Sequence, residues 1–169
     1  MFFRRSALLF SVLVTTASAG AAASPLPDEL AATVPDRPAI QELLDTYTRA
    51  VSTRNQTLFE SLLLNKQIPF AFVGGAAGPN ARIGAERNYE AFRKGVFEGA
   101  PITQSFSDEQ IRQDGALADV TLVFTNVAAS GRSRGFKTMQ LLKVGGRWKI
   151  ASEFFTGHRL ADRAATAGE

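Results

Sequence analysis

The chain has 169 residues, no cysteine and a formal net charge of +3. Without cysteine it can form neither disulfide bonds nor a catalytic thiolate, and a cysteine-linked lipid anchor is excluded. Arg4 and Arg5 carry two of the positive charges, so the residues after them carry a net charge of only +1. A chain so close to charge balance lacks the basic excess of proteins that bind nucleic acid or anionic lipid.

The N-terminus is predicted to be a signal peptide. Arg4 and Arg5 form a charged start, Ala7–Val14 is apolar, and small residues offer cleavage sites near Ala19 or Ala23. The apolar run is shorter than the about 20 residues that span a bilayer, so we expect cleavage and a periplasmic or secreted protein. Export by the general or by the twin-arginine route stays open. The predicted division is a signal peptide over 1–23, a flexible lead-in over 24–38, one domain over 39–160 and a disordered tail over 161–169.

The first half of the domain is predicted to contain three helices. In the first, Asp36 is a candidate N-cap. Its apolar residues keep helical spacing along one stripe, which comprises Ile40, Leu43, Leu44, Tyr47 and Val51. A short second helix is expected over 57–64, where Thr57 and Glu60 have the spacing of a capping box. The third helix is expected over 85–98.

The second half of the domain changes to the alternating pattern that is typical of strands. A short strand over 67–73 and a glycine-rich loop over 74–80 precede the third helix. Gly145-Gly146 suits a tight hairpin in which both residues have positive φ. The long strands are expected over 102–112, 117–130, 135–144 and 147–157.

One face of the last two strands is predicted to line a partly polar pocket. We assign to this face Thr138, Gln140, Leu142, Val144, Trp148, Ile150, Ser152, Phe154 and Thr156. The outer face is then expected to hold Lys137, Met139, Leu141, Lys143, Lys149, Ala151, Glu153 and Phe155. Helices followed by a strongly bent antiparallel sheet make an α+β fold.

Two segments resemble the nuclear transport factor 2-like (NTF2-like) superfamily. AIQELLDTYTRAVSTRN is similar to its opening helix, and LLKVGGRWKIASEFF to its final hairpin, especially in the DUF4440 and lumazine-binding branches. The order of elements over residues 38–158 also resembles SnoaL-like members. The resemblance implies a cone-shaped fold with three N-terminal helices packed on a strongly curved antiparallel sheet. It further implies a homodimer through the outer sheet face, where we expect Met139, Leu141, Ala151 and Phe155.

Tyr47, Gln140 and His158 are the candidate catalytic residues. The resemblance implies that a first-helix tyrosine and a sheet side chain hold an oxyanion, and Tyr47 and Gln140 match those positions. The strand over 67–72 offers no titratable side chain as the base, which disfavours an isomerase. His158 is the only histidine and the chain has no cysteine, so no metal is expected. No cofactor is expected either. The alternatives are a core role for Tyr47 and a solvated or structural His158.

Aromatic side chains from several elements are expected to wall the cone and, with a few polar donors, to suit a small apolar or aromatic ligand. The predicted ligand-binding residues are Tyr47, Phe59, Phe72, Phe92, Phe124, Asn126, Gln140, Trp148 and Ser152. Arg132, Arg134 and Lys137 are interpreted as a basic surface turn, because the chain as a whole has no basic excess.

Three functions stay open at this point, because a fold by itself does not decide a function. The first is a binding protein that holds a small apolar or aromatic molecule without catalysis. The second is a lyase, isomerase or hydrolase of the same fold that uses Tyr47 and Gln140. The third is a non-catalytic dimeric assembly module whose own side chains fill the cone. No nucleic-acid partner and no stable membrane anchor are expected.

Overall fold

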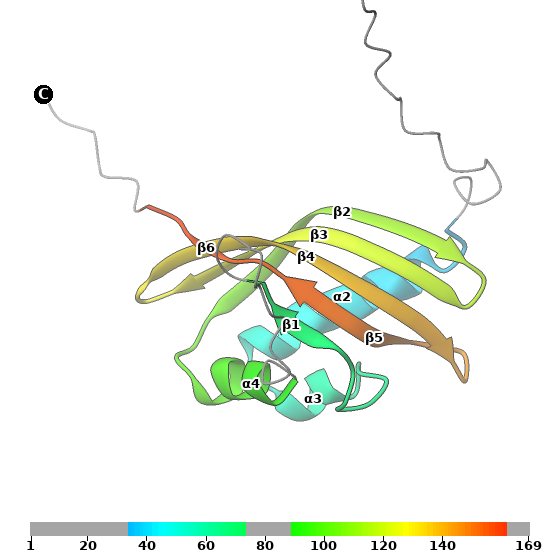
Figure 1. Ribbon diagram of the computed structural model, residues 1–169, viewed down its shortest axis with the longest axis horizontal. Coiled ribbons are helices and arrows are strands. Elements are labelled where there is room, and N and C mark those ends of the chain that lie inside the picture. The colour runs from blue at the N-terminus through cyan, green and yellow to red at the C-terminus, as the bar shows by residue number, and fades with distance from the viewer. Residues whose placement is uncertain (1–33, 74–88, 162–169) are drawn as a thin grey trace, which may run out of the picture.

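A computed structural model describes residues 34–73 and 89–161. The predicted signal peptide, the lead-in before Val34, the glycine-rich loop over 74–80, the segment 85–88 and the tail after Ala161 lie outside the described residues. Within them a curved sheet covers a layer of helices (Figure 1). The predicted α+β class is confirmed. No helix in this part of the chain is long and apolar enough to cross a membrane.

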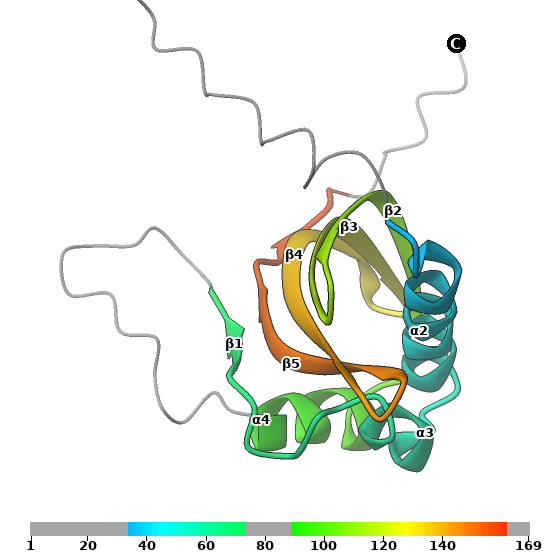
Figure 2. The same cartoon turned by 90° about the vertical axis from the view of Figure 1, so that its right-hand side faces the viewer.

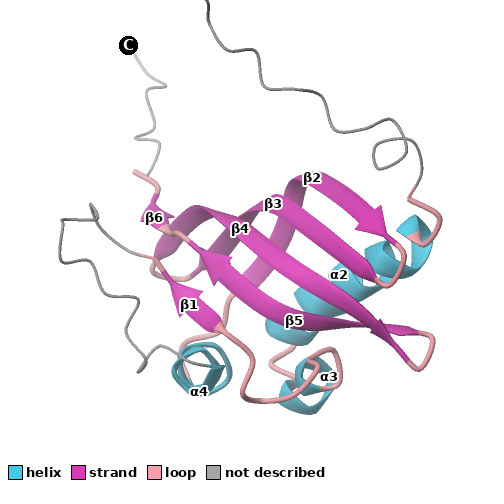
Figure 3. Ribbon diagram, turned by 45° about the vertical axis from the view of Figure 1, so that its right-hand side comes forward, coloured by secondary structure: helices cyan, strands magenta, loops and turns pink. Residues whose placement is uncertain are grey.

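Six strands of the described residues form one sheet, in which five follow the order β1-β5-β4-β3-β2 and β6 lies off this path. The four long strands pair antiparallel, as predicted, whereas the short edge strand β1 pairs in parallel with β5 and makes the sheet mixed. The sheet curls strongly around the helices (Figure 2). β6 pairs with β4 beyond the end of β5 (Figure 3). The strands are β1 (Phe70–Phe72), β2 (Thr103–Asp114), β3 (Leu117–Ala128), β4 (Gly131–Val144), β5 (Arg147–Phe155) and β6 (His158–Arg159).

The first predicted helix is confirmed as α2 (Arg37–Ser52), and its whole apolar stripe is buried. Asp36 is the N-cap residue of α2, as expected, but its side chain makes no cap hydrogen bond. Its carboxylate instead accepts hydrogen bonds from Lys143 Nζ at 2.8 Å and from Gln113 Nε2 at 2.9 Å. Asp36 therefore ties the start of α2 to β4 and β2.

The second predicted helix, 57–64, is shorter in the structure and forms α3 (Gln56–Glu60). Its cap is Asn55 rather than Thr57, because the Asn55 side chain accepts a hydrogen bond from the Leu58 N–H at 2.9 Å. Asn is among the preferred N-cap residues, since its side-chain oxygen satisfies an otherwise unpaired N–H of the first turn.

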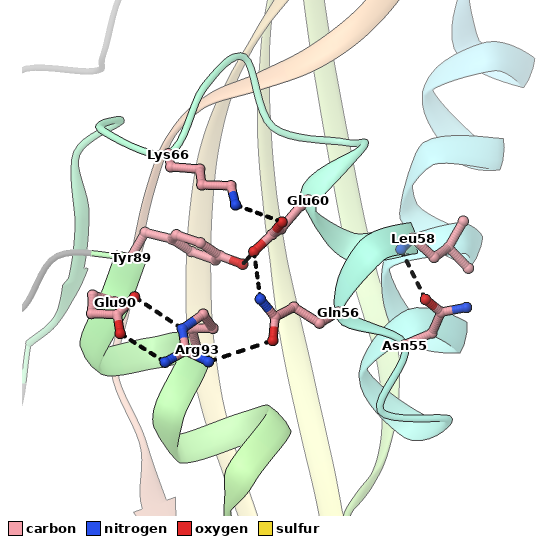
Figure 4. A network of polar contacts seen from close by, with 8 residues as sticks. All are labelled: Asn55, Gln56, Leu58, Glu60, Lys66, Tyr89, Glu90 and Arg93. Carbon is pink, nitrogen blue, oxygen red and sulfur yellow. Dashed lines mark hydrogen bonds and ion pairs between the residues drawn. The ribbon is translucent and has the colours of Figure 1, made fainter.

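The third predicted helix appears as α4 (Tyr89–Arg93), which continues into a π-helical turn, η1 (Lys94–Glu98). Glu60 of α3 joins the two helical segments (Figure 4). Its carboxylate accepts hydrogen bonds from Tyr89 Oη at 3.0 Å and Gln56 Nε2 at 2.7 Å, and it pairs with Lys66 Nζ at 2.8 Å. This network holds α4 against α3.

The hairpin between β4 and β5 has the predicted geometry, since Gly145 and Gly146 have φ of 56° and 76°. A bulge then reverses the alternation of β5. Leu141 of β4 pairs with Ile150 of β5, and Gln140 of β4 pairs with Ser152 of β5. Ala151, which lies between the two β5 residues, therefore has no partner in the ladder. An extra residue of this kind moves the following side chains to the opposite face.

The predicted inner and outer faces of β4 are exchanged, because the turn pairs Lys143 with Trp148, so the inward-facing Trp148 shares its face with Lys143 and not with Val144. Lys137, Met139 and Leu141, expected outside, are buried, and Gln140, expected inside, is exposed. On β5, Ile150 before the bulge and Glu153 after it are both fully buried. On β5 the prediction failed only after Ala151, because it extended one alternation through the bulge.

Candidate functional site

A pocket of about 490 Å³ lies between α4, η1 and the curved sheet, at the end where β5 gives way to β6. Its apolar wall carries the rings of Phe70, Phe72, Phe92, Phe124 and Phe155. Ala91, Val96 and Ile102 add to the apolar wall, and the polar side chains are those of Gln104, Asn126, Ser133, Lys137, Thr156, His158 and Arg159. Mostly apolar pockets of about 300–1,000 Å³ with a few polar groups are typical of small-molecule sites.

Gly135 determines how closely two parts of this wall approach each other. A Cβ added to Gly135 would lie 2.0 Å from the carbonyl oxygen of Thr156 and 2.7 Å from the Phe124 ring. Phe124 and Thr156 both line the pocket. A glycine is required at this point of β4 because any side chain would push the wall apart.

Lys137 of β4, Glu153 of β5 and Tyr47 of α2 form a buried polar triad beside this pocket. Lys137 Nζ lies 2.6 Å from Glu153 Oε1 and donates a hydrogen bond to Tyr47 Oη at 2.5 Å. Tyr47 Oη in turn donates to Glu153 Oε1 at 2.9 Å. Of the three, Lys137 itself lines the pocket.

The Lys137 amine is surrounded by aromatic rings. The ring centroids of Tyr47, Phe106, Phe124 and Phe155 lie 4.2 to 5.5 Å from Nζ. Removal from water disfavours charge, so burial lowers the pKa of the Lys137 amine. The same desolvation raises the pKa of the Glu153 carboxyl and holds the pKa of the Tyr47 hydroxyl well above its usual range.

A second polar group lies in the same wall. Gln104 Nε2 donates to Asn126 Oδ1 at 2.8 Å, and both residues line the pocket. Gln104 Oε1 is buried and accepts no hydrogen bond from the described residues. A buried acceptor without a donor costs about 1–3 kcal/mol, so a ligand that brings a hydroxyl or N–H here would gain by pairing with it.

Similar folds occur among solved structures of low sequence identity. An NTF2-like protein of unknown function from Shewanella baltica matches 76% of this chain and 99% of its own at 17% identity, with a TM-score of 0.53. An NTF2-like protein with a cystatin-like fold from Novosphingobium aromaticivorans matches 78% and 86% at 14% identity, with a TM-score of 0.56. This chain has the NTF2-like fold.

A protein from Novosphingobium aromaticivorans that is provisionally named a scytalone dehydratase also has a similar structure, at 15% identity. The match covers 79% of this chain and 95% of that one, with a TM-score of 0.58. No protein-family model matches the sequence, and no curated protein does. The NTF2-like fold expected from the sequence is thus confirmed by structural neighbours, whereas membership of the superfamily and of its DUF4440 or lumazine-binding branches stays a prediction.

Five of the predicted site residues come together in the pocket of this NTF2-like cone. Phe72, Phe92, Phe124, Asn126 and His158 all line it. They come from β1, α4, β3 and β6, so the fold gathers them from distant parts of the chain. Their role in ligand binding stays a prediction.

Two more predicted residues lie behind the wall. Phe59 is fully buried, with its ring centroid 5.2 Å from that of Phe92. Tyr47 is fully buried too, and it reaches the pocket only through its hydrogen bond to Lys137.

Three predicted residues lie away from the pocket. Gln140 and Ser152 are partners in the β4–β5 ladder on the outer face, where Ser152 Oγ donates to Gln140 Oε1. Trp148 is buried near Lys143, whose Nζ lies 5.9 Å from the Trp148 ring centroid. Tyr47 and Gln140 are therefore on opposite sides of the sheet, and the expected oxyanion pair does not form.

The sequence interpretation missed Lys137 and Glu153. Lys137 was assigned to a basic surface turn and Glu153 to the outer face, but their exposed fractions are 1% and 0%. One feature of the sequence does indicate that Lys137 is buried. It shares a strand face with Met139 and Leu141, so it continues a row of apolar residues. Among the described residues, no group of three or more His, Cys, Asp or Glu side chains is arranged to hold a metal ion.

Proposed function

We propose that this protein binds a small, mainly apolar or aromatic molecule in the pocket between α4, η1 and the sheet. The observation that supports the proposal best is the composition of the wall, in which five phenylalanine rings accompany a few polar groups. Aromatic rings offer large apolar contact areas, and a ring-shaped ligand can stack on them edge to face.

The partly polar wall indicates how the ligand would be oriented. Lys137 of β4 lines the pocket, and so does Gln104 of β2, whose Oε1 is unpaired among the described residues. An aromatic molecule with one or two polar substituents would satisfy these groups and bury its ring among the phenylalanines. A purely aliphatic ligand would leave Gln104 Oε1 unpaired.

The test is a fluorescence titration with N-phenyl-1-naphthylamine, an apolar aromatic probe without a carbonyl group. We expect saturable binding of one probe per chain. Gly95 lines the pocket, and a Cβ added to it meets no atom within 4 Å. Gly95→Phe should therefore occupy the pocket and abolish probe binding, whereas Gly95→Ala should retain it. Equal binding by both variants would rule the pocket out as the site.

Native mass spectrometry of the protein purified after export would identify a natural ligand. A small adduct that is present in the wild type and absent from Gly95→Phe would support the proposal directly.

An enzyme of the same fold is the second candidate. The buried triad of Tyr47, Lys137 and Glu153 favours it, because perturbed titratable groups next to a pocket are typical of active sites. The version that pairs Tyr47 with Gln140 is not supported, because Gln140 lies on the outer face. Loss of turnover in a folded Tyr47→Phe variant would favour an enzyme over a simple binding protein.

An assembly module is the third candidate, and a homodimer is compatible with all three. The outer face of the sheet carries exposed apolar residues, among them Leu117, Phe136 and Val144. Phe136 pairs across the ladder with Val123, which makes an apolar patch on that face. We propose this patch as the dimer surface, in place of the face of Met139 and Leu141 that the sequence indicated.

We also propose that the protein is exported and processed near Ala19 or Ala23. The support is the charged start, the short apolar run and the small residues that follow it. N-terminal sequencing of the protein from a periplasmic or secreted fraction tests this proposal.

A further inference from the structure

The position of Lys137 is unusual for a lysine. Its side chain is almost wholly buried, yet it lines the pocket. Two of the rings near its Nζ, Phe124 and Phe155, have centroids 5.4 Å away and line the same pocket. A ligand that stacks on these rings would bring one end close to the amine.

The charge of Lys137 is already balanced by Glu153. Glu153 Oε1 lies 2.6 Å from Nζ, so the pair as a whole is neutral whether the proton resides on nitrogen or on oxygen. A neutral pair in an apolar wall exerts little attraction on a carboxylate or phosphate, because the gain from pairing must offset the desolvation of the anion. Simple anion binding is therefore a poor explanation for this lysine.

A neutral Lys137–Glu153 pair is compatible with a nucleophilic role for the Lys137 amine. Burial lowers the pKa of Lys137 and raises that of Glu153, which favours the uncharged form of both groups. An amine attacks a carbonyl carbon only through its free electron pair, and enzymes activate lysine for this purpose by placing it in an apolar environment.

We propose that Lys137 Nζ condenses with the carbonyl group of an aromatic aldehyde or ketone held in the pocket and forms a protonated imine. The inference rests on the proposed function, because the pocket must first hold the aromatic ring. Glu153 is the proton carrier of the reaction, and Tyr47 positions Glu153 through its hydrogen bond of 2.9 Å.

The reaction balances without an oxidant or reductant. The electron pair of neutral Nζ forms the C–N bond, the carbonyl π bond breaks, and one proton moves from nitrogen to oxygen to give a carbinolamine. Protonated Glu153 then gives its proton to the hydroxyl group, the C–O bond breaks and water leaves, and the C=N bond forms. The products are an iminium ion and a Glu153 carboxylate, which form an ion pair where the neutral amine and the carboxylic acid lay before.

The test is reductive trapping with 2-naphthaldehyde and sodium cyanoborohydride, followed by peptide mapping of the intact full chain. The sequence has five lysines, Lys66, Lys94, Lys137, Lys143 and Lys149. Lys137 is the most enclosed of these, so an inert Lys137 would be labelled last. We expect it to be labelled first, because each unit by which its pKa is lowered raises the neutral fraction about tenfold.

Matched variants connect the labelling to the proposed roles. Lys137→Met should lose the fast label, whereas the exposed control Lys94→Met should keep it. Glu153→Gln should label Lys137 several-fold more slowly, since the amide cannot carry the proton. N-phenyl-1-naphthylamine should protect Lys137, but not Lys94, if the aldehyde occupies the same pocket. Because the main readout is on the wild type, it stands even where a variant does not fold.

The outcomes separate this inference from the proposed function. Fast, protectable labelling of Lys137 supports both. Probe binding that Gly95→Phe abolishes, together with slow labelling of Lys137, overturns the imine and leaves the binding function in place. Failure of the wild type to bind either the probe or the aldehyde overturns both.

Discussion

Lys137 Nζ on β4 and Glu153 Oε1 on β5 lie 2.6 Å apart in the interior of the fold. The two residues are not directly opposite each other, since the ladder pairs Lys137 with Phe155 and Glu153 with Met139. They meet diagonally across the inner face of the hairpin. Burial of a charge in a protein requires a partner of opposite charge or a change of protonation, and this pair permits both.

Loss of one member of this pair should therefore destabilise the fold strongly, whereas replacement of both members by apolar side chains should change the stability little. Lys137→Met or Glu153→Leu alone should lower the free energy of unfolding by about 3–5 kcal/mol, because each leaves an unpaired polar group in the core. The double variant should come close to wild-type stability, since apolar side chains then replace both. Urea denaturation of the four proteins gives the coupling. Additive losses in the double variant would mean that the two groups do not act as a pair.

Gly135 should tolerate no side chain. Gly135→Ala places a methyl group 2.0 Å from the Thr156 oxygen, so we expect a loss of about 1–3 kcal/mol or more from overpacking. Gly95→Ala is the matched control, because its Cβ meets no atom within 4 Å. It should be neutral or more stable by up to about 1 kcal/mol, as alanine restricts the unfolded chain more than glycine. Thermal denaturation compares the two, and equal effects would contradict this account of the wall.

Glu60 should give the protein a characteristic acid sensitivity. Its hydrogen bond from Lys66, with those from Gln56 and Tyr89, holds the pKa of the Glu60 carboxyl below its ordinary value of 4.5. A carboxyl whose pKa is lower in the folded state stabilises the protein above the unfolded-state pKa. That contribution declines as the pH falls from 4.5 through the lower folded-state pKa.

The measurement is a series of urea denaturations at decreasing pH. Glu60→Gln should be less stable than the wild type at neutral pH, and its stability should fall less steeply below pH 4.5. Glu42→Gln, an exposed substitution on α2, serves as the control and should follow the wild-type curve. A Glu60→Gln curve parallel to that of the wild type would show that the network in Figure 4 does not shift this carboxyl.

The proposed dimer surface predicts a monomeric variant. Phe136 is 50% exposed on the outer sheet face, and Phe136→Asp should convert a dimer at micromolar concentration into a monomer in sedimentation velocity. Leu64→Asp, an equally drastic change at an exposed residue outside the sheet, should leave the dimer intact. A wild type that sediments as a monomer at this concentration would overturn the homodimer itself.

Much of the fold followed from local patterns in the sequence. The apolar stripe from Ile40 to Val51 predicted α2, and alternation with turn residues predicted the four long strands within a few residues of their ends. Gly145-Gly146 predicted its hairpin, since glycine readily adopts the positive φ angles that a tight two-residue turn requires. These features depend on neighbours in the chain, and the sequence alone determined them.

The site depended on contacts between distant residues, which only the tertiary structure decided. Neither the parallel pairing of β1 with β5 nor the bulge near Ala151 has a local sequence signal here, and the bulge decides which residues of β5 face inward. Lys137 appeared to be a surface residue because a lysine is buried only where a partner compensates its charge. Its partners Glu153 and Tyr47 are 16 and 90 positions away in the chain, and the curvature of the sheet over α2 brings all three together.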